Sequence, residues 1–184
     1  MLWVTREYLH LDRVATPWLI SRFVDKDAQF CYVPWKQEHL APKDAIPFAL
    51  PGCELGPHDK EGSTFGKVLK KYNIKNESLD RIKNIIDAGI AYVLDGFKPD
   101  SKDHEGQIAV GLLAVAEGIS LTNQTDDKIL SASFTVYDAL YANFKTQETM
   151  LAQNIVLDFP PKDGRGPSLI FEITRDVYNN SVVK

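Results

Sequence analysis

The sequence predicts a helix-rich, mixed α+β domain with a small sheet. Two short β-prone runs, Leu2 to Thr5 and Gln29 to Val33, lie near the start of the chain. Apolar residues recur at helical spacing from Glu77 to Leu94, and a longer helical stretch from Asp126 to Thr146 carries an aromatic stripe. Short strands followed by long helices are typical of α+β folds, in which helices cover a small sheet.

The composition is that of an ordinary globular protein. The chain has 184 residues, of which 44% are hydrophobic and 25% charged, so it is long enough to bury a core without disulfides. Lys and Arg total 21 against 25 Asp and Glu, and this net charge of −4 argues against broad binding to a phosphate backbone. With no apolar run long enough for a membrane span and no signal-peptide pattern, we expect a cytoplasmic protein with no membrane contact.

The first helix is predicted to begin with Thr16 as its N-cap and Pro17 as its first residue, a favourable pair, and to continue to Val24. Its side chains are apolar around most of the circumference, which indicates a buried helix. Further along the chain, Ser63 or Thr64 can cap a short helix.

Two later helix ends carry clear signals. The helix from Glu77 is expected to end before Gly96. Asp103 can cap the next helix, which we expect to be closed by Gly118.

The C-terminal part of the sequence has a strand-like pattern, unlike the helical segments before it. Asn154 to Phe159 and Leu169 to Thr174 look like two strands, which predicts a β-hairpin or arm. We therefore expect one domain over residues 1–149 and an extension over residues 150–184 that can pair two subunits as a homodimer.

A group of charged residues surrounds the first predicted helix. Arg13 lies beside a helix N-terminus, where the helix dipole disfavours a cation, so it needs a carboxylate or a bound anion nearby. A helix N-terminus flanked by arginines is a suitable oxyanion site. The alternative is that Asp12 and Asp138 neutralise these arginines as structural ion pairs.

A second group could bind a divalent metal. His58 and Glu61 lie three residues apart, and His104 and Glu105 open a predicted helix, so the four could form a mixed nitrogen and oxygen site if their segments converge. The alternative is that they serve as helix caps and solvated surface residues. No cofactor is otherwise indicated, since the chain has no Walker loop, dinucleotide fingerprint or Cys-x-x-Cys motif.

The first segments of the chain resemble a known family. The sequence Trp-Val-Thr-Arg at residues 3–6 is followed by Asp-Arg-Val-Ala-Thr-Pro-Trp-Leu-Ile-Ser-Arg-Phe at residues 12–23. This order resembles the opening signature of the chromate-resistance (ChrB-type) C-terminal domain. Residues 51–65, Glu105 with the glycine-containing helix that follows, and residues 137–141 agree as well, so the resemblance extends to about Phe144.

The resemblance implies a role in chromate resistance, because full-length relatives are described as chromate-responsive regulators. The matching positions are Arg6, Asp12, Arg13, Trp18, Arg22, His58, Glu105, Asp138 and Tyr141. Many relatives have a cysteine where this chain has Ser63, and an acidic residue where it has Gly66. The regulators' N-terminal DNA-binding region is not in this sequence, so we do not expect this domain to bind nucleic acid on its own.

The leading hypothesis is a domain that binds or senses a small, chromate-like oxyanion. Its predicted ligand-binding residues are Arg6, Asp12, Arg13, Thr16, Trp18, Arg22, Asp138 and Tyr141. Two alternatives stay open. One is a metal-dependent enzyme of unknown reaction that uses His58, Glu61, His104 and Glu105. The other is a structural domain that dimerises through its tail.

Overall fold

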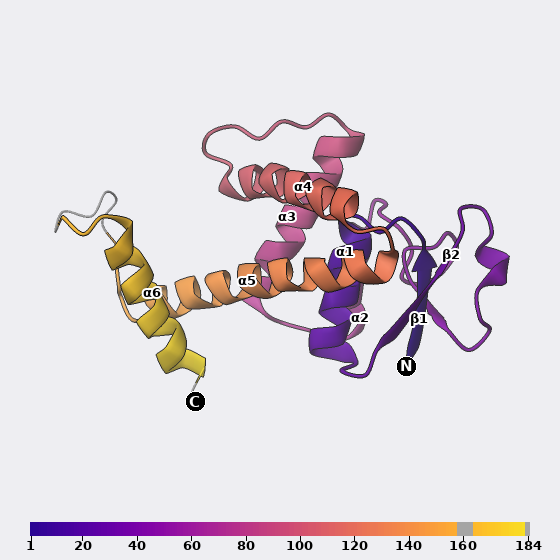
Figure 1. Cartoon of the computed structure of the whole chain (residues 1–184), viewed down its shortest axis with the longest axis horizontal. Helices are drawn as coiled ribbons and strands as arrows, with labels where there is room; N and C mark the ends of the chain where they lie inside the picture. The colour runs from indigo at the N-terminus through magenta and orange to yellow at the C-terminus, as the bar shows by residue number, and fades with distance from the viewer. Residues whose placement is uncertain (158–163, 183–184) are drawn as a thin grey trace. The chain divides into compact units, whose positions relative to one another are not determined.

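A small parallel sheet lies near the N-terminus of the computed structural model, which describes residues 1–157 and 164–182 (Figure 1). Its strands are β1 (Leu2–Arg6), β2 (Gln29–Val33) and β3 (Ile46–Pro47). The order is β2-β1-β3, with β1 in the centre and paired in parallel to both neighbours. The helix-rich α+β fold expected from the sequence is confirmed.

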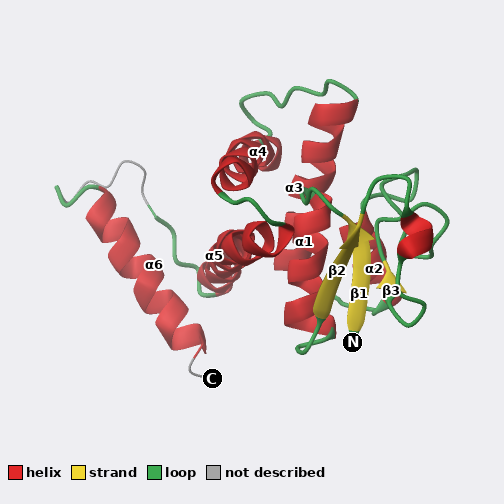
Figure 2. Ribbon diagram, turned by 45° about the vertical axis from the view of Figure 1, so that its right-hand side comes forward, coloured by secondary structure: helices red, strands yellow, loops and turns green. Residues whose placement is uncertain are grey.

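The two faces of the sheet are covered differently. Val4 packs with Val33 and Leu50, and with partly buried side chains from the segment after β2. Trp3 points to the opposite face, since successive side chains of a strand alternate, and it contacts Phe48 and Tyr72. Helices α1 and α2 lie along one side of the sheet in Figure 2.

The first helix begins earlier than predicted. Helix α1 spans Asp12–Leu19 and continues into a π-helical turn, η1 (Ile20–Val24). Thr16 is therefore not the N-cap, and Pro17 lies inside the helix. The reason is that Leu11, with a φ of 47°, already turns the chain, and its carbonyl accepts the backbone N–H groups of the next helical turn. The Thr-Pro pair favours a helix start on local grounds, but the prediction is wrong because the turn at Leu11 starts the helix four residues before Thr16.

The middle of the chain follows the predictions more closely. Helix α2 (Thr64–Lys71) has Ser63 as its N-cap, whose hydroxyl accepts the Gly66 N–H at 3.3 Å. Helix α3 spans Glu77–Leu94, as expected. Helix α4 (His104–Thr122) is capped by Asp103 but runs past the predicted stop. A helix-interior glycine such as Gly118 costs only about 1 kcal/mol and does not by itself end a helix.

The last two helices are α5 (Asp126–Ala152) and α6 (Pro167–Val182). The predicted strand from Leu169 to Thr174 is wrong, because these residues lie within α6. Residues 154–157 of the other predicted strand form no strand, and its last two residues lie outside the described ranges. The β-branched side chains that suggested a strand also occur at helical spacing, and a short apolar run cannot separate the two.

The chain forms two compact units, Met1–Tyr137 and Asp138–Lys184, and α5 contributes to both. The predicted domain limit after residue 149 stays a prediction. Within the described ranges, no helix is both long enough and apolar enough to cross a membrane.

Two glycines of α4 provide a test of its packing. A Cβ added at Gly106 would lie 2.7 Å from the Pro99 Cβ and closer still to the Asp103 carboxylate, whereas one at Gly111 would meet nothing within 4 Å. We expect Gly106→Ala to destabilise the protein by about 1–3 kcal/mol through this overlap. Gly111→Ala should stabilise it by roughly 0.5–1 kcal/mol, because alanine is the better helix former. Chemical denaturation measures the change in the free energy of unfolding of each variant. A Gly106→Ala variant more stable than the parent protein would contradict the packing described.

Candidate functional site

The loop between β1 and α1 is strained and firmly held. Tyr8 and Leu11 have φ angles of 61° and 47°, a conformation that costs non-glycine residues energy and is found where a site needs a fixed shape. The carboxylate of Asp126, at the start of α5, accepts the backbone N–H groups of Tyr8 at 3.0 Å and Leu9 at 2.8 Å. These bonds hold the loop in place, with His10 between its two strained residues.

Arg13 holds the same loop from the other side. Its guanidinium donates to the backbone carbonyl oxygens of Arg6 at 3.2 Å and Glu7 at 2.9 Å. Burial lowers the pKa of Arg13, and the nearby charge of Arg6 lowers it further. The carbonyl groups of the loop are thus the hydrogen-bond partners of Arg13, and its side chain stabilises the conformation of the loop.

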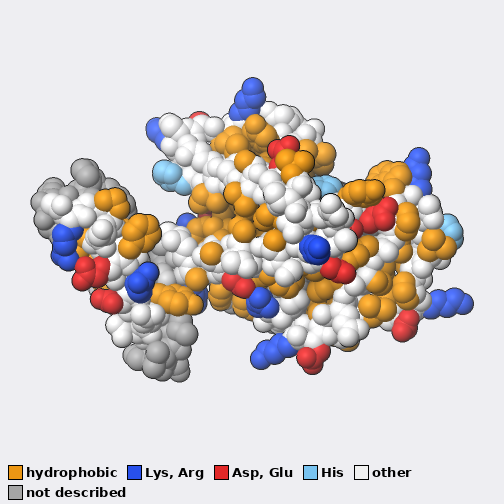
Figure 3. Space-filling model, in the orientation of Figure 1, with side chains coloured by type: hydrophobic (Ala, Val, Ile, Leu, Met, Phe, Trp, Pro, Cys, Tyr) orange, Lys and Arg blue, Asp and Glu red, His pale blue; other side chains and the backbone are white. Residues whose placement is uncertain are grey.

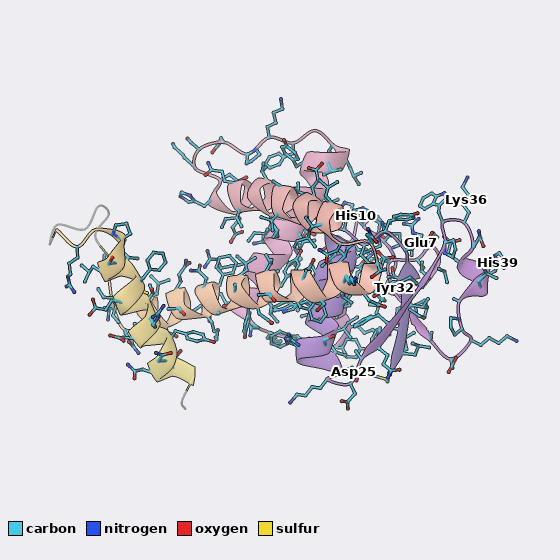
Figure 4. The ribbon with its side chains drawn as sticks, viewed as in Figure 1. Glu7, His10, Asp25, Tyr32, Lys36 and His39 are labelled. Carbon is cyan, nitrogen blue, oxygen red and sulfur yellow. The ribbon has the colours of Figure 1, made fainter. Side chains whose placement is uncertain are left out.

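His10 lies on this loop beside Arg13. Its Nδ1 lies 2.8 Å from the Tyr8 carbonyl oxygen, to which it donates when it carries the proton. Arg13 Nη2 lies 3.1 Å from Nδ1 and 3.4 Å from Nε2, and it can donate only to a ring nitrogen that carries no proton. Loss of solvation lowers the pKa of His10, and the charges of Arg13 and Arg6 add to the effect. Figure 4 shows His10 and Glu7 at the carboxyl end of β1.

Arg6 has a different environment. It is the last residue of β1, and its guanidinium carbon lies 4.2 Å from the ring centre of Trp35, a stacking arrangement that suits arginine. Its Nε is buried and has no hydrogen-bond partner among the described residues. A buried donor left without a partner costs about 1–3 kcal/mol. Of the two described residues with such an atom, Thr5 and Arg6, only Arg6 lines the cleft described below, so an acceptor bound there could satisfy it.

Asp12 joins α1 to α2. Its buried carboxylate accepts the backbone N–H groups of Thr64 at 2.7 Å and Phe65 at 3.0 Å, and the Thr16 hydroxyl at 2.9 Å. Burial raises the pKa of Asp12, while these hydrogen bonds oppose the rise. The backbone hydrogen bonds of Asp12 go to the N-terminus of α2, while its charge favours the cationic form of Arg13 and opposes the fall in the pKa of Arg13. The role of Asp12 in holding the arginines in place stays a prediction.

The turn that carries His58 is fixed by a buried lysine. Lys67 of α2 is only 9% exposed. Its ammonium group donates to the Pro57 carbonyl oxygen at 2.7 Å and to the Asp59 carboxylate at 2.8 Å. Thr64 donates its hydroxyl to the Gly56 carbonyl oxygen at 2.9 Å. His58 is therefore presented by a turn that is anchored on both sides.

These segments surround a cleft of about 1210 Å³ within the first unit. One wall is polar and comes from the β1–α1 loop, with His58, Thr64 and Asp126. The other wall is largely apolar and comes from the end of α3 and from α4. Clefts of this kind, apolar with a few convergent polar groups, are the usual form of small-molecule sites.

The cleft brings together part of the predicted ligand set. Arg6, Asp12 and Arg13 line it, and so does His58 from the predicted metal set. Thr16 and Trp18 are fully buried instead, and Trp18 packs against the rings of Phe23 and Tyr137 as part of the core. Three predicted residues do not line this cleft: Arg22, which lies over the Phe134 ring, and Asp138 and Tyr141, which belong to the second unit. Their roles as ligand residues stay predictions.

The predicted metal set is not gathered. Glu105 forms an ion pair with Arg81 at 3.3 Å, and of the four residues only His58 lines the cleft. Across residues 1–157 and 164–182, no three His, Cys, Asp or Glu side chains come together in a group able to hold a metal ion. Sequence spacing could not reveal this, because both pairs lie on segments whose convergence depends on the tertiary fold.

Sequence reasoning missed three residues of the site. His10 is not among the predicted site residues, although its position between a strand end and Asp12-Arg13 is a usable signal. Trp35 and Asp126 gave no signal, because their contacts with Arg6 and the loop are made at long range.

Comparison with known proteins identifies the family. The family model described as the C-terminal domain of ChrB matches residues 3–144. The chain belongs to the ChrB C-terminal domain family. This confirms the resemblance to chromate-resistance proteins, and it places the cleft and its polar wall within the matched region.

A curated member of the ChrB family shows how much is shared. Over 146 residues the chain is 31% identical to Protein ChrB of Cupriavidus metallidurans, and the alignment covers 78% of this chain. It covers 41% of that protein, so the chain spans about two fifths of the length of its relative. No solved structure matches the chain.

The Asp12 contact can be tested directly. We expect Asp12→Asn to destabilise the protein by roughly 1–3 kcal/mol, because an amide NH₂ placed beside two backbone donors leaves at least one of them unsatisfied. Asp44→Asn, which makes the same change at an exposed position, should have little effect. Urea denaturation measures both, and equal stabilities would show that the contact between α1 and α2 does not depend on the charge.

His10 predicts a pH dependence of stability. Because its pKa is lowered in the folded protein, the folded state binds fewer protons at His10 than the unfolded chain does below the ordinary value of 6.5. The stability that His10 contributes is therefore present above pH 6.5 and is lost as the pH falls through the folded pKa. His10→Gln should flatten this slope in denaturation curves measured from pH 8 to pH 5. His39→Gln, which removes an exposed histidine, is the control.

Proposed function

We propose that this chain is the ligand-binding domain of a chromate-resistance system and that its cleft binds an oxyanion against Arg6. Membership of the ChrB family supports the biological role. The buried, unpartnered Nε of Arg6 is the observation that carries the assignment of the site.

Arg6 is already arranged for an anion. The Trp35 ring lies 4.2 Å from the guanidinium carbon and limits its movement, so less rotational freedom is lost when its donors engage a ligand. An oxyanion that accepts from Nε forms a charge-assisted hydrogen bond, which is stronger than one between neutral groups.

The local charges support the same end of the cleft. Arg6 and Arg13 are close enough to repel each other: the pKa of Arg13 is lowered first by burial and then by the charge of Arg6, while Asp126 and Asp12 oppose the shift. An anion beside Arg6 would reduce this repulsion. The carboxylates of Asp12 and Asp126 are occupied by backbone N–H groups, so their lone pairs are directed away from a ligand.

The other hypotheses have less support. A metal-dependent enzyme requires His58, Glu61, His104 and Glu105 to converge, and the described residues hold no such group. The cytoplasmic location, the homodimer and the absence of nucleic-acid binding stay predictions.

Removal of the Arg6 side chain tests the proposed site. In equilibrium dialysis with chromate and with sulfate, we expect Arg6→Ala to weaken binding at least tenfold, which corresponds to about 1.4 kcal/mol. Arg175→Ala removes the same charge from an exposed position on α6 and should bind like the parent protein. Unchanged affinity in a folded Arg6→Ala variant would overturn the assignment.

A further inference from the structure

The apolar wall of the cleft has no part in oxyanion binding. It is formed by Ile90 and the residues after it on α3, and by Val110 and Leu113 on α4. Near the end of α3, Val93 and Leu94 are 59% and 69% exposed, which is costly for large apolar side chains unless something covers them. Figure 3 shows hydrophobic side chains gathered over α4 and the neighbouring part of the first unit.

The cleft is also far larger than an inorganic anion. A tetrahedral oxyanion is comparable in size to a few water molecules, each of which occupies about 30 Å³ in the liquid. The cleft measures about 1210 Å³, somewhat more than the range of about 300–1,000 Å³ typical for sites that hold drug-sized molecules. A bare oxyanion at Arg6 would leave most of this space to water in contact with apolar side chains.

Most charged side chains of the cleft lie on the polar wall. The basic residues Arg6 and Arg13 are found there with the acidic residues Glu7, Asp12 and Asp126. The carboxylates of Asp12 and Asp126 already accept backbone N–H groups. Among the described lining residues from α3 and α4, the one charged side chain is that of Glu117. A second anionic group at that wall would meet a carboxylate of the same sign, so the cleft favours a molecule that is anionic at one end only.

From this distribution we propose that the cleft binds an organic anion, with its oxyanion group at Arg6 and its apolar body against α3 and α4. The proposal rests on the proposed function, because it uses the same Arg6 site, and it adds the class of ligand. The anionic group can be a carboxylate, sulfonate or phosphate, since Arg6 recognises the oxygen atoms that all three share. A free oxyanion would occupy only the polar end.

Two probes with the same anionic group separate these possibilities. Methanesulfonate carries almost no apolar body, whereas naphthalene-2-sulfonate carries one of the size of a large side chain. We expect the naphthalene compound to bind at least tenfold more tightly in titration calorimetry, because its rings displace water from the apolar wall. Equal affinities would overturn the proposal and leave oxyanion binding at Arg6 intact.

Matched variants on α4 locate the apolar body. Leu113 lines the cleft, whereas Val115 lies on the same helix outside the lining and is 47% exposed. Leu113→Asn should weaken naphthalene-2-sulfonate at least fivefold and leave methanesulfonate unchanged, and Val115→Asn should change neither. Val110→Asn repeats the test where Leu113→Asn fails to fold. Loss of both probes equally in the lining variants would overturn the assignment of the wall.

Arg6→Ala separates failure of this proposal from failure of the proposed function. It should weaken both probes at least tenfold. Methanesulfonate binding that survives Arg6→Ala would overturn the oxyanion site itself, and with it the position of the anionic end. Weakened methanesulfonate together with unchanged naphthalene-2-sulfonate would leave the oxyanion site standing and overturn the organic-anion proposal.

Discussion

The buried carboxylate of Asp12 is the contact on which the rest of the first unit depends. It begins α1 in the sequence, yet its hydrogen bonds cap α2, fifty residues further along the chain. A carboxylate at a helix N-terminus satisfies backbone donors that would otherwise be orphaned in the core. One side chain therefore fixes where α2 begins relative to the end of β1, and the two loops that form the polar wall are brought to the same place.

Because that position is fixed, the two arginines of the wall can take different roles. Arg13 donates hydrogen bonds to carbonyl groups of the β1–α1 loop, and Asp126 accepts backbone N–H groups of the same loop. Between them they maintain a backbone with two left-handed residues that would relax if either restraint were lost. Arg6 does not hold this loop with its side chain. Its guanidinium lies against the ring of Trp35 beside the cleft.

The fold class and the central helices could be predicted from the sequence because they depend on local signals. Apolar spacing and N-caps such as Ser63 and Asp103 act within a few residues. The start of α1 and the helix α6 could not. A left-handed turn at Leu11, a non-glycine residue, decides the first, and a short β-branched run is ambiguous for the second. The residues of the site likewise differ in whether local sequence could predict them. Arg6 and Arg13 were found as a charged group near a helix, whereas the partners that give them different roles, Trp35 and Asp126, are distant in sequence.

This distinction bears on how the family signature is interpreted. The matched opening segment contains residues that form the cleft and residues that support it, and sequence similarity alone does not separate them. Trp18 is fully buried against other rings, so a change there would affect the core before any ligand. Arg6 has an unsatisfied buried donor at the cleft, so under the proposed function a change there would affect binding first. Members that keep the buried tryptophan and differ at Arg6 would then share this scaffold while binding a different ligand, or none.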